Sequence, residues 1–211
     1  MEYKILDMQT YKRKAHFEYF RSLPYPYVGT TAEVDVTSLV KYCKENCRSF
    51  YLAVLHAAAL AADQIPELRQ RIHDDGIIEY SECPTSHVEL LEDQTYCYCT
   101  VHHHMPASEY FDQAEAARKA CKNNGIEEEE DAESMYFIST LPLLHYTSLI
   151  QPVAGGDESN PRITWGRYEE KADGTILMPV SILVHHALAD GLQIAAFYQN
   201  LEQQIRLFAE G

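Results

Sequence analysis

The sequence predicts a single α/β domain in which helices flank a sheet of mixed direction. Segments with apolar residues at helical spacing alternate with strand-like segments along the 211 residues, which is the pattern of α/β folds. The run 175–184 is apolar on nearly both faces, as in a strand at the centre of a sheet. Because no internal repeat or long Pro/Gly/Ser linker divides the chain, residues 1–211 are expected to form one domain.

Each expected element rests on its local pattern. Helices are predicted at 14–21, 37–47, 50–64, 107–123 and 190–208, and strands at 76–82, 86–91, 95–103, 134–140, 162–170 and 175–184. The last two strands flank the residues 171–174, Lys-Ala-Asp-Gly, a sequence typical of a hairpin turn. Asp190 suits the N-cap of the last helix, and the acidic run 127–131 is expected to be a solvated loop.

Composition and charge exclude several classes of partner. Acidic residues outnumber basic ones by 32 to 17, for a net charge of −15, whereas nucleic-acid binding draws on clustered Lys and Arg. The sequence has no basic amphipathic stretch of the kind that binds a membrane surface. The longest apolar run, 51–62, is too short to cross a bilayer. The first residues lack the layout of a signal peptide, so a cytoplasmic location is expected.

The six cysteines are expected to be reduced thiols of the core rather than disulfides or metal ligands. Cys43 and Cys47 lie four apart in a helical pattern with Leu39, which predicts a shared buried stripe. Cys97 and Cys99 lie two apart in a strand-like run, so their side chains share one face. Neither pair has the two-residue spacing of a zinc knuckle.

The chemistry of the chain is indicated by the segment 185–191, His-His-Ala-Leu-Ala-Asp-Gly. Two histidines end the predicted central strand, and an aspartate and a glycine open the next helix. Histidine takes and returns a proton near neutral pH, and a strand-to-helix turn is a rigid mount for it. Asp190 could hold this turn through a hydrogen bond or an ion pair, and Gly191 would let the backbone turn tightly.

The same region carries a family resemblance. Residues 177–191, LMPVSILVHHALADG, closely resemble the chloramphenicol acetyltransferase family. Other family landmarks follow in family order and at close to family spacing at 11–18, 49–51, 65–69, 141–142 with 146–148, and Thr164 followed by 166–168. The match covers almost the whole chain, so the resemblance implies the CoA-dependent acyltransferase fold of that family.

The resemblance also implies an activity, the direct transfer of acetyl from acetyl-CoA to an acceptor hydroxyl. The expected acceptor is chloramphenicol, which would make the protein an antibiotic-resistance enzyme. His186 would be the general base, Ser148 would donate to the oxyanion, and Thr164 would assist the intermediate through water. Taken singly, the two hydroxyls are typical of structural residues, and only their register with His186 gives them these roles. No acyl-enzyme is implied.

Supporting residues follow from the same resemblance. Asp190 would pair with Arg13 to hold the catalytic turn. Arg167 and Tyr168 match positions that contact CoA, where a guanidinium suits phosphate and a ring can stack on adenine. The acceptor pocket would be lined by Phe20, Leu23, Tyr25 and Tyr27. The family further implies a homotrimer with active sites between subunits.

The acceptor pocket departs from the family pattern, which leaves other functions open. Phe20 stands where the family often has tyrosine, and Leu143 where it usually has tryptophan. An acetyltransferase for another hydroxyl is therefore an alternative, as is a non-catalytic or metal-binding protein that uses residues 102–104, His-His-His. On a strand, His102 and His104 would face one side. Because no third ligand stands at a recognised spacing, no metal is expected.

Overall fold

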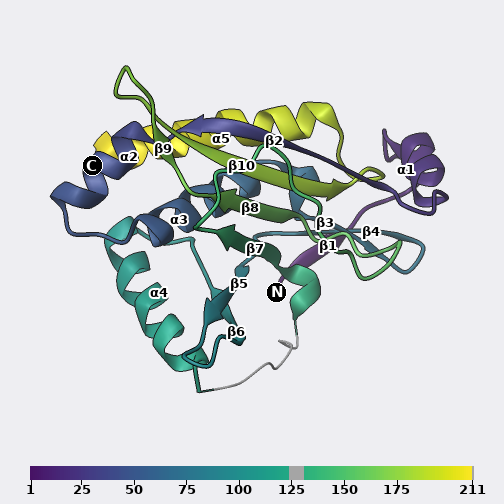
Figure 1. Cartoon of the computed structure of the whole chain (residues 1–211). Coiled ribbons are helices and arrows are strands. Elements are labelled where there is room, and N and C mark those ends of the chain that lie inside the picture. The colour runs from purple at the N-terminus through teal and green to yellow at the C-terminus, as the bar shows by residue number, and fades with distance from the viewer. Residues whose placement is uncertain (124–130, 211) are drawn as a thin grey trace.

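The computed structural model describes residues 1–123 and 131–210 (Figure 1). Within these residues a sheet has the strand order β2-β10-β8-β7-β5-β6, with β9 paired to β10. These strands are β2 (Tyr27–Asp35), β5 (Thr85–Leu90), β6 (Tyr96–Val101), β7 (Tyr136–Leu141), β8 (Arg162–Gly166), β9 (Glu169–Glu170) and β10 (Ile176–His185). β5 and β8 run parallel to β7, and the other pairs are antiparallel. The predicted mixed sheet is confirmed.

The strand β10 lies at the centre of this sheet, as the apolar run predicted. It pairs with β2 from Leu177 to His185 on one side and with β8 from Val180 to Leu183 on the other. The hairpin turn predicted before it is present, because β9 pairs with the start of β10. Gly174 has a φ of +86° in this turn, a conformation that favours glycine.

The helices agree closely with the expected ranges. They are α1 (Lys14–Arg21), α2 (Thr37–Glu45), α3 (Phe50–Asp63), α4 (Ala107–Cys121) and α5 (Gly191–Glu210), with short 3-10 turns at η1 (Pro66–Arg69) and η2 (Ala132–Ser134). One detail was wrong: α2 ends before Cys47, which is exposed and has a φ of 52°. Cys43 is buried as predicted, but the shared stripe with Cys47 does not form. The solvated loop expected at 127–131 lies outside the described residues, apart from Asp131.

Three strands were not expected from the sequence. β1 (Tyr3–Ile5) and β3 (Gln70–His73) form a small second sheet around β4 (Gly76–Tyr80), in the order β1-β4-β3. β2 is half exposed along most of its length, so it has no clear alternation of apolar and polar residues. Gly29 within it lies so close to β10 that a Cβ would stand 2.4 Å from the Ile182 carbonyl oxygen. Pairing with β10 therefore defines this strand, not its own composition.

Helices α2, α3 and α5 supply the main core that covers the sheet. α3 is buried around nearly its whole circumference, and α4 packs beside β6 at the opposite side of the molecule from α1 (Figure 1). The main core contains five of the cysteines, and the structure holds all six as free thiols, as expected. No helix among the described residues is both long and apolar enough to cross a membrane.

A second, smaller apolar cluster joins α1 to the turn after β10. Its buried members are Phe17, Ile72, Ile77, Ala187 and Leu188. Phe17 comes from α1, and Ala187 and Leu188 come from the turn that carries the histidine pair. This packing fixes the N-terminal helix against the predicted catalytic segment, although the two are about 170 residues apart in sequence.

Candidate active site

The turn after β10 is held by main-chain hydrogen bonds. The His186 amide donates to the Pro26 carbonyl oxygen at 2.7 Å, and the amides of Leu188 and Ala189 donate to the His185 carbonyl oxygen at 3.0 and 3.1 Å. Because Ala187, Leu188 and Ala189 are also buried, the backbone of this segment has little freedom. The pair of histidines is thus mounted on a rigid turn at the end of the central strand.

Both ring nitrogens of His185 are committed to the main chain. Its Nε2 bonds to the Gly156 carbonyl oxygen at 2.7 Å, so this nitrogen carries the proton. Its Nδ1 accepts from the Ala187 amide at 3.2 Å. Burial lowers the pKa of His185 below its usual range. These contacts fix a neutral ring in one tautomer, which suits a structural residue rather than a proton carrier.

His186 has a different environment. It is half-buried, and its ring stacks on that of Phe20 with centroids 3.7 Å apart and an angle of 14°. Its Nδ1 is buried without a hydrogen-bond partner among the described residues, whereas Nε2 is not enclosed and bonds to none of them. Of the two histidines, only His186 presents a ring nitrogen that an approaching molecule can reach.

Asp190 joins the turn, the last helix and the N-terminal helix. Its Oδ2 accepts from Arg13 Nη1 at 2.8 Å, and its Oδ1 accepts from the Leu192 amide at 2.9 Å. Its own amide donates to Gln193 Oε1 at 3.1 Å, which completes a capping box at the start of α5. The hydrogen bond from Arg13 lowers the pKa of Asp190 below its usual range. The ion pair predicted from the sequence is therefore present.

Gly191 does not have the role that the sequence suggested. It is the first residue of α5, its φ is not positive, and a Cβ placed there would meet nothing within 4 Å. The turn is made instead by the capping contacts of Asp190. A glycine is not required at this position for conformational reasons.

The predicted acceptor-binding residues gather beside the histidines. Besides Phe20, which stacks on His186, Tyr27 lies close to the pair. Its ring centroid is 5.3 Å from that of His185, and its hydroxyl donates to the Glu158 carbonyl oxygen at 2.8 Å. Tyr25 lies 5.1 Å from Tyr27, ring to ring, and is 56% exposed. Leu23 is half-buried. Phe20 thus lies against His186 and Tyr27 against His185, with Tyr25 beside Tyr27.

Ser148 and Thr164 lie elsewhere in the same chain. Ser148 is exposed in the loop between β7 and β8 and lines a pocket of about 340 Å³ with residues 181–183 of β10. Thr164 is buried, pairs with Ser181, and its Oγ1 accepts from Gln151 Nε2 at 2.6 Å. Ser181 precedes His186 by five residues, roughly 17 Å along an extended strand. One chain therefore does not bring these hydroxyls to His186.

Arg167 and Tyr168 follow β8 near the opposite end of β10. Arg167 is more than half exposed and its Nη2 pairs with Glu169 Oε1 at 3.0 Å. The ring of Tyr168 packs edge-on against Phe50, with centroids 5.1 Å apart. Both side chains reach the surface, where an extended ligand could contact them, but neither contacts the histidine turn.

Two features of the structure were missed by sequence reasoning. A hollow of about 610 Å³ lies on the sheet and is lined by Phe137, Glu158 and Arg162 among others. Nothing in the sequence marked it, because its walls come from four separate segments. The second is a contact of His103 and His104 with Asp63. The expectation that His102 and His104 share one side of a strand was wrong, since β6 ends at Val101 and the alternation stops there.

Comparisons with known proteins agree with this architecture. A family model described as chloramphenicol acetyltransferase matches residues 1–202. A chloramphenicol acetyltransferase of Klebsiella sp is 29% identical over 210 residues, covering 95% of this chain and 93% of that protein. Chloramphenicol acetyltransferase 3 of Escherichia coli is 28% identical over 208 residues, covering 96% and 97%.

Solved structures show the same fold. A chloramphenicol acetyltransferase superposes with a TM-score of 0.83 at 23% identity, covering 97% of this chain and all of that one. A probable dihydrolipoamide acetyltransferase from Listeria monocytogenes follows with a TM-score of 0.69 at 14% identity, covering 92% and 89%. With the family model spanning nearly its full length, this chain belongs to the chloramphenicol acetyltransferase family and is an acyltransferase.

Proposed function

We propose that the protein is an acetyl-CoA-dependent O-acetyltransferase whose acceptor is chloramphenicol and whose general base is His186. The observation that carries the proposal is the contrast within the histidine pair: His185 has both nitrogens bonded, and His186 presents an unbonded Nε2. Family membership supplies the reaction class. Residues 1–211 would act as one domain, in the cytoplasm, and the activity would confer resistance to the antibiotic.

In the proposed reaction, Nε2 of His186 takes the proton from the acceptor hydroxyl while the hydroxyl oxygen attacks the acetyl carbonyl carbon. The neutral ring must then carry its first proton on Nδ1, the buried nitrogen. The resulting tetrahedral oxyanion collapses, the carbon–sulfur bond breaks, and the CoA thiolate takes the proton back from His186. Arg13 and Asp190 take no part in the proton transfer and act by holding the turn.

Ser148 would donate a hydrogen bond to the oxyanion, a contact typically worth about 2.7–4 kcal/mol of barrier, and Thr164 would act through water. Because both lie far from His186 along one chain, we propose that the site is shared between copies of a homotrimer. His186 of one copy would face the Ser148 pocket of the next.

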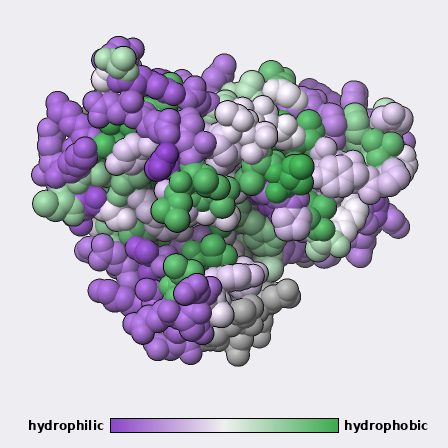
Figure 2. Space-filling view, viewed as in Figure 1, coloured by the Kyte–Doolittle hydropathy of each residue, from purple (hydrophilic) through white to green (hydrophobic). Residues whose placement is uncertain are grey.

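Exposed apolar residues support the homotrimer. Leu143, Leu144 and Ile150 are 83%, 58% and 94% exposed, and all belong to the loop that carries Ser148. Figure 2 shows hydrophobic side chains gathered at the centre of the face that this loop crosses. Large apolar side chains grouped in this way are typical of a surface that another chain covers. Light scattering that finds a monomer at micromolar concentration would contradict this arrangement.

Arg167 and Tyr168 are proposed to contact CoA. The exposed guanidinium would meet a phosphate and the phenol ring would lie along the adenine. Arg167→Ala should raise the KM for acetyl-CoA with little change in kcat at saturation, because this contact is equal in the ground state and the transition state. A fall in kcat with an unchanged KM would argue against the assignment.

The decisive test of the proposed function is an assay of CoA release. The protein is mixed with acetyl-CoA, chloramphenicol and a thiol reagent, and release is compared for the wild type, His186→Ala and the exposed control His102→Ala. We expect turnover in the wild type and the control only. If a panel of other alcohols gives a kcat/KM that is orders of magnitude above that of chloramphenicol, the acceptor assignment is wrong and the acetyltransferase assignment stands.

A further inference from the structure

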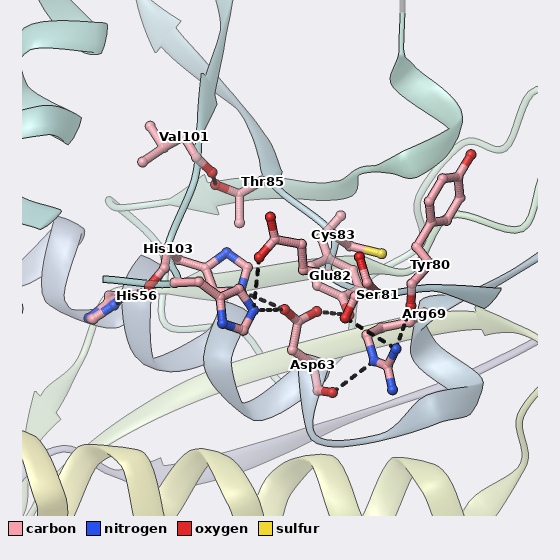
Figure 3. Close-up of polar contacts among 12 residues, drawn as sticks. His56, Asp63, Arg69, Tyr80, Ser81, Glu82, Cys83, Thr85, Val101 and His103 are labelled. Carbon is pink, nitrogen blue, oxygen red and sulfur yellow. Dashed lines mark hydrogen bonds and ion pairs between the residues drawn. The ribbon is translucent and has the colours of Figure 1, made fainter. Parts of the chain in front are cut away.

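A group of side chains that the proposed reaction does not use lies where helix α3 meets the segment after β6. Asp63 is the last residue of α3, His103 and His104 follow β6, and Glu82 follows β4. Figure 3 shows the Asp63 carboxylate directed towards the imidazole of His103, with Glu82 close by. Three segments distant in sequence thus present metal-ligating side chains to one point.

The donor atoms converge on a single carboxylate oxygen. Asp63 Oδ2 lies 2.8 Å from Nε2 of His103 and 2.5 Å from Nε2 of His104. All three atoms lie within 4.8 Å of one another. Glu82 Oε2 stands 3.7 Å from the same nitrogen of His104. Two imidazoles and one or two carboxylates therefore share a volume that a single ion could occupy.

The charge of Asp63 has no permanent cation to balance it. The side chain is only 6% exposed, and a buried carboxylate is normally paired with a cation or coordinated to a metal. The neighbouring Arg69 donates instead to the main-chain carbonyl oxygens of Asp63 and Tyr80 (Figure 3). Among the described residues, no Lys or Arg side chain bonds to this carboxylate. The cluster thus lacks positive charge where it is most deeply buried.

Contacts around the cluster orient its donors. The Tyr136 hydroxyl, which is fully buried, donates to Asp63 Oδ1 at 2.6 Å and leaves Oδ2 directed at the histidines. His56 Nε2 donates to the His103 carbonyl oxygen at 2.9 Å, and this hydrogen bond fixes the backbone that joins His103 to His104. Hydrogen bonds of this kind around metal ligands set their orientation.

The cluster is closed on one side and open on the other. The side chain of His103 is 1% exposed, whereas those of His104 and Glu82 are 47% and 38% exposed. An ion could enter from water past His104, and water could remain as a ligand. The half-exposed side chains can also move by the small amount that coordination needs.

We propose that Asp63, His103 and His104 form a binding site for a divalent transition-metal ion, with Glu82 as a further ligand. Zn²⁺ fits this donor set, because it takes imidazole nitrogen and carboxylate oxygen in tetrahedral geometry. Mg²⁺ and Ca²⁺ prefer oxygen ligands alone. The ion would cross-link the end of α3 to the segment that leads into α4, and this role is independent of acetyl transfer.

Binding requires modest changes at the donors. With bonds of about 2.0–2.1 Å, ligand atoms of a tetrahedral Zn²⁺ site stand roughly 3.3–3.4 Å apart, so the present contacts of 2.8 and 2.5 Å must open by less than about 1 Å. Each imidazole must also free Nε2 of its proton. In His103, Nδ1 has no hydrogen-bond partner among the described residues, so moving the ring proton to Nδ1 breaks no bond there.

The test is a titration of the full chain, treated with a chelator and then dialysed. Zn²⁺ is followed by calorimetry, Co²⁺ is followed by its visible absorption, and Mg²⁺ serves as the control ion. We expect one Zn²⁺ per chain, a tetrahedral Co²⁺ spectrum and no binding of Mg²⁺. At a free Zn²⁺ concentration of 100 times Kd, the Tm should rise by about 5–10 °C.

Matched variants locate the site. His104→Ala removes a half-exposed ligand, and should raise the Kd for Zn²⁺ at least about tenfold and so reduce the rise in Tm to about half or less at the same free Zn²⁺ concentration. His102→Ala removes an exposed neighbour that lies outside the cluster, and should change neither. Wild-type protein that binds Zn²⁺ no better than His104→Ala, or equal loss in both variants, would overturn the proposal.

Discussion

Adjacent histidines stand at two places in the protein: His185–His186 after β10, and the run 102–104 after β6, in which His103 and His104 form the second pair. In each pair the first histidine is buried and the second reaches further towards solvent. Their neighbours differ. At the first pair the nearby carboxylate, Asp190, is bound by Arg13. At the second, Asp63 has no such cation and holds both imidazoles itself.

The two places differ in what binds the nearby carboxylate, and this difference separates the two proposed roles of histidine. Asp190 is bound by Arg13, and His186 has no hydrogen bond to a described residue, which suits the proposed proton exchange with a bound molecule. Asp63 draws the nitrogens of His103 and His104 to one point, which suits a cation better than proton transfer. The dipeptide is the same at both places, and the chemistry is set by residues remote in sequence.

Among the variants that test this contrast, removal of the proposed base His186 should lower activity the most. His186→Ala should lower kcat/KM by about 10²–10⁴ or more, because proton removal from the acceptor is lost, while the chain stays folded. His185→Ala should affect the chemical step less, because that ring bonds only to the main chain. Steady-state kinetics with a circular dichroism control measure this, and a folded His186→Ala variant with wild-type turnover would refute the assignment.

Breaking the ion pair of Arg13 with Asp190 should cost stability as well as activity. The side chains of Arg13 and Asp190 are 21% and 34% exposed, between the buried and surface cases, so Arg13→Ala and Asp190→Asn should each cost about 1–2 kcal/mol. For a chain of this size that lowers Tm by about 2–8 °C. Lys14→Ala on the same helix, with an exposed partner 3.9 Å away, is the matched control. Unchanged melting of both pair variants would count against a supporting role.

Acid should lower the free energy of unfolding of the protein through His185, the buried member of the first pair. Burial lowers the pKa of this imidazole, so below about pH 6.5 the unfolded chain binds a proton that the folded chain resists. Its contribution to the free energy of unfolding is therefore lost as pH falls below that value, with a slope of at most about 1.4 kcal/mol per pH unit. Urea unfolding of the wild type and His185→Gln at pH 5 and 7.5 should show a smaller pH effect in the variant. Equal slopes would show that His185 does not titrate in this way.

The smallest effect on activity is expected from a change of Phe20, whose ring stacks on His186. Phe20→Tyr adds a hydroxyl beside His186, where the family often has one. A new hydrogen bond of about 0.5–1.5 kcal/mol would lower the KM for chloramphenicol by up to roughly tenfold. Tyr19→Phe, an exposed neighbour, is the control. A KM that stays the same or rises in Phe20→Tyr would indicate that the acceptor does not reach this ring.

Elements whose cause is local could be predicted from the sequence. The helix at 14–21, the central strand near 175–184, the turn with Gly174 and the cap at Asp190 all follow from periodicity, turn chemistry and capping within a few residues. The family resemblance added the pairing of Arg13 with Asp190, which the structure contains. The catalytic roles of His186 and Ser148 remain predictions.

Features that depend on contacts between distant segments could not be predicted from the sequence. β2 is a strand because nine of its residues pair with β10, not because of its composition, and Cys47 is exposed because α2 ends two residues before it. Ser148 is separated from His186 because its loop packs beside residues 181–183 of β10, whereas His186 follows the end of that strand. Asp63 reaches His103 and His104 across 40 residues of chain. Such contacts arise from packing of the whole chain, which no short sequence pattern encodes.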